Sequence, residues 1–187
     1  MSITLLSIDL AKNVFQLHGV DKKGKAVLKK RVGRNKLIET VANIPGCTIV
    51  MEACGGANHW CRQFKKYGHE VKLISPQYVK AFVKTNKNDS NDAEAIAEAA
   101  MRPSMYFVSP KSIEQQDIQI IHRIRERFIK QRTGLANQIR GIMTEYGIVI
   151  PKGICFLRRD LYSILEDASN SLTMMMRELL KTLRMSY

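Results

Sequence analysis

The sequence has no long hydrophobic run and few cysteines. No stretch approaches about 18 consecutive apolar residues, and the first ten residues, MSITLLSIDL, lack a basic start and contain an aspartate. We therefore expect neither a membrane span nor a signal peptide, and a cytoplasmic protein. The four cysteines show no C-x-x-C spacing, which argues against a secreted disulfide scaffold and favours buried thiols. A zinc site of Cys54, His59 and Cys61 is the alternative, but these ligands are crowded at irregular spacing.

Acidic residues are also scarce. The 187 residues include 17 Asp and Glu against 30 Lys and Arg, which gives a formal net charge of +13. Such an excess attracts polyanions, so we expect a nucleic-acid partner, with solubility alone as the simpler explanation of the charge. The hydrophobic content of 45% is that of a folded protein and excludes a disordered tail.

The first part of the chain alternates between strand and helix patterns. Apolar or alternating runs at 3–9, 14–20 and 26–32 predict a three-stranded antiparallel meander. The meander is followed by a helix capped by Asn35, a buried strand ending at Glu52 and a helix from about 58 to 67. A strand at 69–74 and a helix opened by Pro76 come next. This order is that of a ribonuclease H-like α/β fold, a mixed sheet flanked by helices, and we assign it to residues 1–108.

A long helical pattern occupies residues 112–146. Its apolar residues recur at alternating three- and four-residue steps, as in a coiled-coil seam. They are Ile121, Ile124, Phe128, Leu135, Ile139 and Ile142. Residues 157–183 form a second helical stretch that can fold back as an antiparallel partner, so 109–187 is expected to be a helical coiled-coil region through which copies associate as a dimer or tetramer.

Basic residues occupy the other faces of this helix, where they either contact phosphates or are simply solvated. Those selected as nucleic-acid ligands are Arg123, Arg127, Lys130 and Arg140.

Four carboxylates lie where a ribonuclease H-like sheet would bring them together. Asp9 ends the first strand and Glu52 ends the fourth, and these two strands are parallel neighbours in such a sheet. Asp89 and Asp92 are three residues apart at the start of a helical pattern, which places them on one face. Grouped carboxylates need a cation, and hard oxygen ligands select Mg²⁺ or Mn²⁺. Two such ions can promote phosphodiester transfer.

Each acid also has an ordinary explanation. Asp89 can be a helix N-cap, Asp92 can interact with the helix dipole, and Asp9 and Glu52 can be polar residues at strand ends. Their joint placement favours the metal site.

Four separated segments resemble the DEDD transposases of bacterial insertion sequences, which are related to the invertase Piv. They are IDLAKNVFQLHGVD (8–21), VMEACGGANHW (50–60), LISPQYVKAFVKTNKNDSNDAEAIAEAA (73–100) and LANQIRGIMTEYGI (135–148). The family's four acids fall on Asp9, Glu52, Asp89 and Asp92, and the resemblance implies that these residues are catalytic and bind Mg²⁺ or Mn²⁺ in a RuvC-like nuclease domain.

The resemblance further implies DNA recombination guided by a structured noncoding RNA, and a carboxy-terminal domain with a nucleophilic serine. The sequence ends at Tyr187 without that domain, so we expect this chain alone to be incomplete or inactive and to form no covalent adduct with DNA. Lys12, Lys84 and Lys87 lie near the acids in sequence and are expected to contact phosphates. Ser7 is expected to pack or form a hydrogen bond inside the sheet.

Two other functions remain open. The first is a truncated, noncatalytic protein that binds RNA or DNA, or that prevents the assembly of longer copies, and the missing carboxy-terminal domain keeps this alternative open. An actin-like or sugar-kinase-like ATPase shares the strand order, but residues 10–13, Leu-Ala-Lys-Asn, offer no glycine or threonine to hold a phosphate.

Overall fold

A computed structural model describes the backbone of residues 2–83 and 89–184, and the side chains of residues 2–83 and 91–183. The chain divides into two compact units, Met1–Ile113 and Glu114–Tyr187. The first contains the sheet and the second is helical.

The first unit is built on a six-stranded sheet in the order β3-β2-β1-β4-β5-β6. The strands are β1 (Leu5–Asp9), β2 (Val14–Val20), β3 (Ala26–Gly33), β4 (Thr48–Glu52), β5 (Glu70–Ile74) and β6 (Phe107–Val108). The first three form an antiparallel meander, β4 is parallel to β1, β5 is parallel to β4, and β6 is antiparallel to β5. This mixed sheet confirms the predicted α/β class and is consistent with a ribonuclease H-like fold. The pattern does not predict β6, which is only two residues long.

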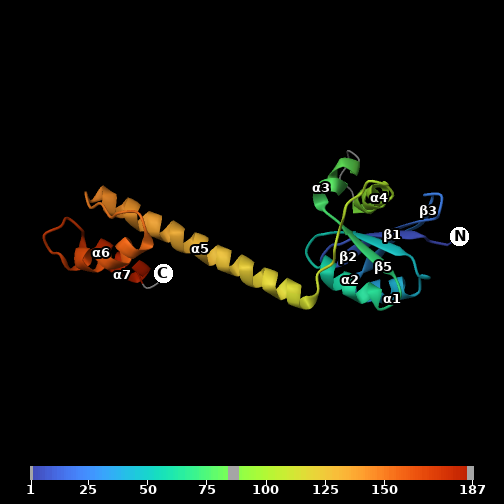
Figure 1. The fold of residues 1–187 in the computed structure, drawn as a ribbon, viewed down its shortest axis with the longest axis horizontal. Helices are drawn as coiled ribbons and strands as arrows, with labels where there is room; N and C mark the ends of the chain where they lie inside the picture. Colours follow the sequence, from blue (N-terminus) through green and yellow to red (C-terminus); the bar gives the residue numbers. More distant parts are fainter. Residues whose placement is uncertain (1, 84–88, 185–187) are drawn as a thin grey trace. The chain divides into compact units, whose positions relative to one another are not determined.

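Helices cover both faces of the sheet. One face carries α1 (Arg34–Ala42) and α2 (Ala57–Lys65), and the other carries α3 (Pro76–Val79), the 3₁₀ turn η1 (Lys80–Phe82) and α4 (Asp89–Ala100) (Figure 1). The alternation of side chains along β4 explains how one strand serves both layers. Ile49 and Met51 belong to the core beneath α1 and α2, whereas Val50 packs in the core with Ile96 of α4.

Two local predictions are wrong. The N-cap of α1 is Gly33 and not Asn35, because β3 runs directly into the helix without an intervening turn. The thiols are also not all buried: Cys47 and Cys61 are, but Cys54 and Cys155 are exposed.

The second unit consists of α5 (Ile113–Glu145), α6 (Ile154–Glu166) and α7 (Met174–Arg184). The predicted long helix is confirmed to within a residue at each end. The predicted stretch 157–183, however, is two helices, because the connection between them is stabilised as a loop. Arg177 donates hydrogen bonds to the carbonyl oxygens of Leu165 at 2.6 Å and Asp167 at 2.9 Å and to the side chain of Asn170 at 2.6 Å.

The core of this unit lies near the carboxyl end of α5. Ile139 and Met143 of α5 pack with Leu157 and Leu161 of α6 and Leu180 of α7, and all five are fully buried. Within the described part of the chain, no helix is both long enough and apolar enough to span a membrane.

Candidate metal centre and nucleic-acid interface

Asp9 and Glu52 meet at the carboxyl edge of the two central strands. The parallel register pairs Ile8 with Met51, and each acid is the next residue on its strand. Side chains alternate between faces along a strand. Ile8 and Met51 belong to the core under α1 and α2, so Asp9 and Glu52 point to the opposite face, the one covered by α4. Both are partly exposed.

Asp92 of α4 brings a third carboxylate to this edge. Burial raises the pKa of Glu52 above its ordinary value, and the negative charge of Asp92 raises the pKa further. Burial also raises the pKa of the Cys54 thiol, and the negative charges of Glu52 and Asp9 raise that pKa further. Glu52 and Asp92 therefore interact electrostatically, and Asp9 and Glu52 both act on Cys54 near the ends of β1 and β4.

Among residues 2–83 and 91–183, whose side chains are described, no group of three His, Cys, Asp or Glu side chains is close enough to form a complete metal site. The side chain of Asp89 lies outside the described residues, although its backbone begins α4. The same finding leaves no support for a zinc site of Cys54, His59 and Cys61, since Cys61 is buried in the core and Cys54 is exposed.

Ser7 connects the sheet to α4. Its side chain is fully buried, and its hydroxyl lies 3.0 Å from the carbonyl oxygen of His18 and within hydrogen-bonding distance of the carbonyl oxygen of Ala93. Ala93 follows Asp92 directly, so this contact fixes the start of α4 over β1, two residues from Asp9. Ser7 therefore has the packing and hydrogen-bonding role predicted for it.

The predicted phosphate ligands fall into three groups. Lys12 is exposed beside the carboxyl edge, in the segment between β1 and β2, whereas Lys84 and Lys87 lie outside the described residues. Arg123, Arg127 and Lys130 are exposed on α5. Arg140 donates hydrogen bonds to the carbonyl oxygens of Pro151 at 3.2 Å and Gly153 at 2.7 Å, so it also holds the connection between α5 and α6.

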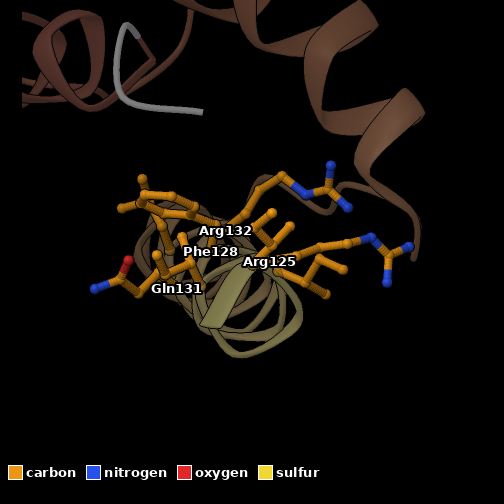
Figure 2. Close-up of a pocket in the computed structure, with 8 residues that line it drawn as sticks. Arg125, Phe128, Gln131 and Arg132 are labelled. Carbon is orange, nitrogen blue, oxygen red and sulfur yellow. The ribbon is translucent and has the colours of Figure 1, made fainter. Parts of the chain in front are cut away.

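Part of the predicted seam is not covered within its unit. Ile121, Ile124 and Phe128 of α5 are 65%, 47% and 64% exposed, whereas Ile139 further along the same helix is fully buried. Figure 2 shows this apolar face, with Phe128 and Gln131 projecting from the helix and Arg125 and Arg132 on its flank. The seam is therefore packed only where α6 and α7 cover it.

One basic residue at the carboxyl edge was not predicted from the sequence. Arg34, the first residue of α1, lines a hollow together with Lys12, from which it is separated by 22 residues. A lone arginine at a helix start is common, so no sequence pattern singles it out.

Comparison with known proteins shows the family of this chain. The family model of the IS110-type DEDD transposases matches residues 6–148. The chain is 49% identical over 181 residues to the transposase for insertion sequence element IS1111A of Coxiella burnetii, which covers 97% of this chain and 50% of that protein. It is 45% identical over 158 residues to the transposase for IS1328 of Yersinia enterocolitica, covering 84% and 47%. A probable family 20 transposase of Pseudomonas aeruginosa is 46% identical over 149 residues, covering 80% and 44%. The chain thus spans about half the length of the curated relatives it matches. The match to the family model and these identities show that the chain belongs to the DEDD transposase family of bacterial insertion sequences.

Proposed function

We propose that this chain is the metal-binding part of a transposase that cleaves and transfers DNA strands for an insertion sequence. The observation that carries the proposal is the placement of Asp9 and Glu52 at adjacent ends of parallel strands, together with the electrostatic effect of Asp92, near the start of α4, on Glu52. Membership of the transposase family supplies the reaction class.

The donor set fits a hard divalent cation. Carboxylate oxygens are the ligands that Mg²⁺ and Mn²⁺ prefer. The raised pKa of Glu52 indicates partly buried negative charge that a cation would stabilise. Asp9, Glu52, Asp92 and, by sequence, Asp89 would hold the ions. Two bound ions of this kind supply activation of an attacking oxygen and stabilisation of the leaving oxygen in phosphodiester transfer.

The partners we propose are DNA, a structured guide RNA and a second copy of this chain. The net charge of +13 and the exposed Arg123, Arg127 and Lys130 support polyanion binding. The exposed seam of α5 supports self-association, because Ile121, Ile124 and Phe128 keep the spacing of a coiled coil and their own unit leaves them open. Pairing the seams of two copies would bury these side chains.

A thermal denaturation experiment tests the metal site. For a dissociation constant of about 1 mM, 10 mM Mg²⁺ would stabilise the folded chain by about 1.4 kcal/mol and raise the Tm by roughly 4 °C. The double variant Asp9→Asn, Asp92→Asn should fold but lose this response. A matched control, Glu39→Gln with Glu70→Gln, removes the same charge elsewhere in the unit and should keep it.

An equal response of the Asp9, Asp92 variant and the native chain would contradict the metal assignment. Incubation of supercoiled plasmid with the chain and Mn²⁺ then separates the two candidate functions. Metal-dependent nicking that the double variant lacks supports the nuclease, whereas a mobility shift with intact plasmid favours a noncatalytic nucleic-acid-binding protein.

A further inference from the structure

A hollow of about 450 Å³ lies at the same edge of the sheet as the carboxylates, toward the layer of α1 and α2. Its lining comes from the segment after β1, the start of α1, and the turn from β4 into α2. The residues concerned are Leu10, Ala11, Lys12, Arg34, Cys54, Gly55, Gly56, His59 and Trp60. None of these nine residues is acidic. Cys54 lines the hollow and also interacts electrostatically with Glu52 and Asp9, so the hollow and the carboxylates are neighbours.

Arg34 is held in a defined orientation in this hollow. Its Nη1 donates a hydrogen bond to the carbonyl oxygen of Lys12 at 3.1 Å, and its backbone N–H donates to the carbonyl oxygen of Asn13 at 2.8 Å. Its guanidinium carbon lies 5.2 Å from the ring centroid of Trp60. A planar guanidinium fixed in this way loses little side-chain entropy when it binds the oxygens of a phosphate. The residue is nevertheless exposed to solvent and therefore accessible to a ligand.

The backbone around the hollow is also electropositive. Both α1 and α2 begin here, and their N-caps are Gly33 and Gly56, which have no side chain with which to cap the helix. The first turns of the two helices contain no acid. Two helix amino termini without acidic compensation add partial positive charge to that of Arg34 and Lys12.

The aromatic residue of the hollow argues for a phosphate and against a base as the ligand. Trp60 is 5% exposed and is covered by Arg34 on one side, with Phe15 and Phe64 packed against it. Its ring face is therefore not accessible for stacking by a nucleobase. The two charged side chains that line the hollow, Arg34 and Lys12, are both cationic and exposed.

We propose that this hollow binds the DNA phosphate next to the one that reacts at the carboxylates, with Arg34 and Lys12 as its ligands. The inference rests on the proposed function and adds a strand-binding site to it. The carboxylate edge repels a DNA strand electrostatically, and a cationic site beside it holds the strand in place. A strand that runs from Glu52 past Cys54 to Arg34 would contact both sites.

Trp60 is the only tryptophan of the chain and lies beneath Arg34, so its fluorescence reports on the hollow. The experiment titrates the full chain, in EDTA, with a labelled 12-nucleotide single-stranded DNA and follows both anisotropy and Trp60 emission corrected for absorption. The native chain should show an emission change that saturates together with binding. Arg34→Gln should abolish that change and lower the slope of log affinity against log salt by about 0.7. The ratio of native to variant affinity should therefore be about fivefold larger at 0.1 M than at 1 M salt.

Arg102→Gln is the matched control. Arg102 is another exposed arginine, and its guanidinium carbon lies 5.4 Å from the ring centroid of Phe82. Its replacement removes the same charge and the same kind of stacking, and it should preserve the emission change and the salt slope. Circular dichroism of both variants shows whether each retains the fold.

An emission change or salt slope that survives in folded Arg34→Gln would overturn the proposal, as would a native chain whose Trp60 emission does not respond to bound DNA. A response to 12-nucleotide RNA but not to the DNA would also overturn it. Because EDTA removes divalent metal, this result is independent of the magnesium-dependent Tm, and failure of the metal site can be told apart from failure of the phosphate site.

Discussion

Ser7→Ala tests how α4 is attached to the sheet. The substitution deletes one buried hydroxyl that lies between the carbonyl oxygens of His18 and Ala93 and changes little else, because alanine fills the remaining volume. Ala93 is an interior helix residue, so its carbonyl keeps the regular helix hydrogen bond. The expected loss is therefore that of a single net hydrogen bond, about 1 kcal/mol. For a unit of this size that lowers the Tm by roughly 4 °C.

Amide hydrogen exchange supplies the informative measurement. Ser7→Ala should speed exchange throughout α4, because the helix loses an attachment to β1 beside Asp92. Thr4→Val is the matched control. The Thr4 hydroxyl donates to the carbonyl oxygen of Val20 at 3.2 Å, which links the residue before β1 to the end of β2 and does not involve α4. It should be destabilising without affecting α4. Equal exchange of α4 in the two variants, or an unchanged Tm in Ser7→Ala, would refute the reasoning.

Three further predictions concern the metal, the nucleic acid and the second copy. Glu52→Gln should raise the Tm in EDTA, because it removes a partly buried carboxylate whose pKa is raised. It should also abolish the increase of the Tm with Mg²⁺, and a lower Tm in EDTA would contradict the prediction. Reversing the charges of Arg123, Arg127 and Lys130 should reduce the salt slope of DNA binding by about one unit for each phosphate that is no longer neutralised, and an unchanged slope would assign these residues to a solvated face. Phe128→Glu should shift the association equilibrium, measured by sedimentation, toward the monomer, since we propose that a second copy buries the exposed ring. A native chain that is monomeric at high concentration would contradict that proposal.

The local chemistry of the sequence determined most of the elements and the strand ends. Alternation of apolar and polar residues in 14–20 and the buried run ending at Glu52 predicted strands that the structure confirms, and the seam spacing predicted α5. These signals are readable because they repeat over several residues. The two-residue β6 and the loop that separates α6 from α7 have no such repetition. Tertiary interactions stabilise them, such as the hydrogen bonds of Arg177 to Leu165 and Asp167.

The sequence by itself determined which acids end their strands and that the chain carries a large positive charge. Only the tertiary structure decided which groups act together. Parallel pairing of β1 with β4 brings Asp9 beside Glu52, and the hydrogen bond from Ser7 to Ala93 sets Asp92 over them. The same folding places Arg34 against Lys12 and Trp60 in one hollow. Such groupings depend on interactions between residues 22 to 86 positions apart, and the periodicity of a single segment contains no information about them.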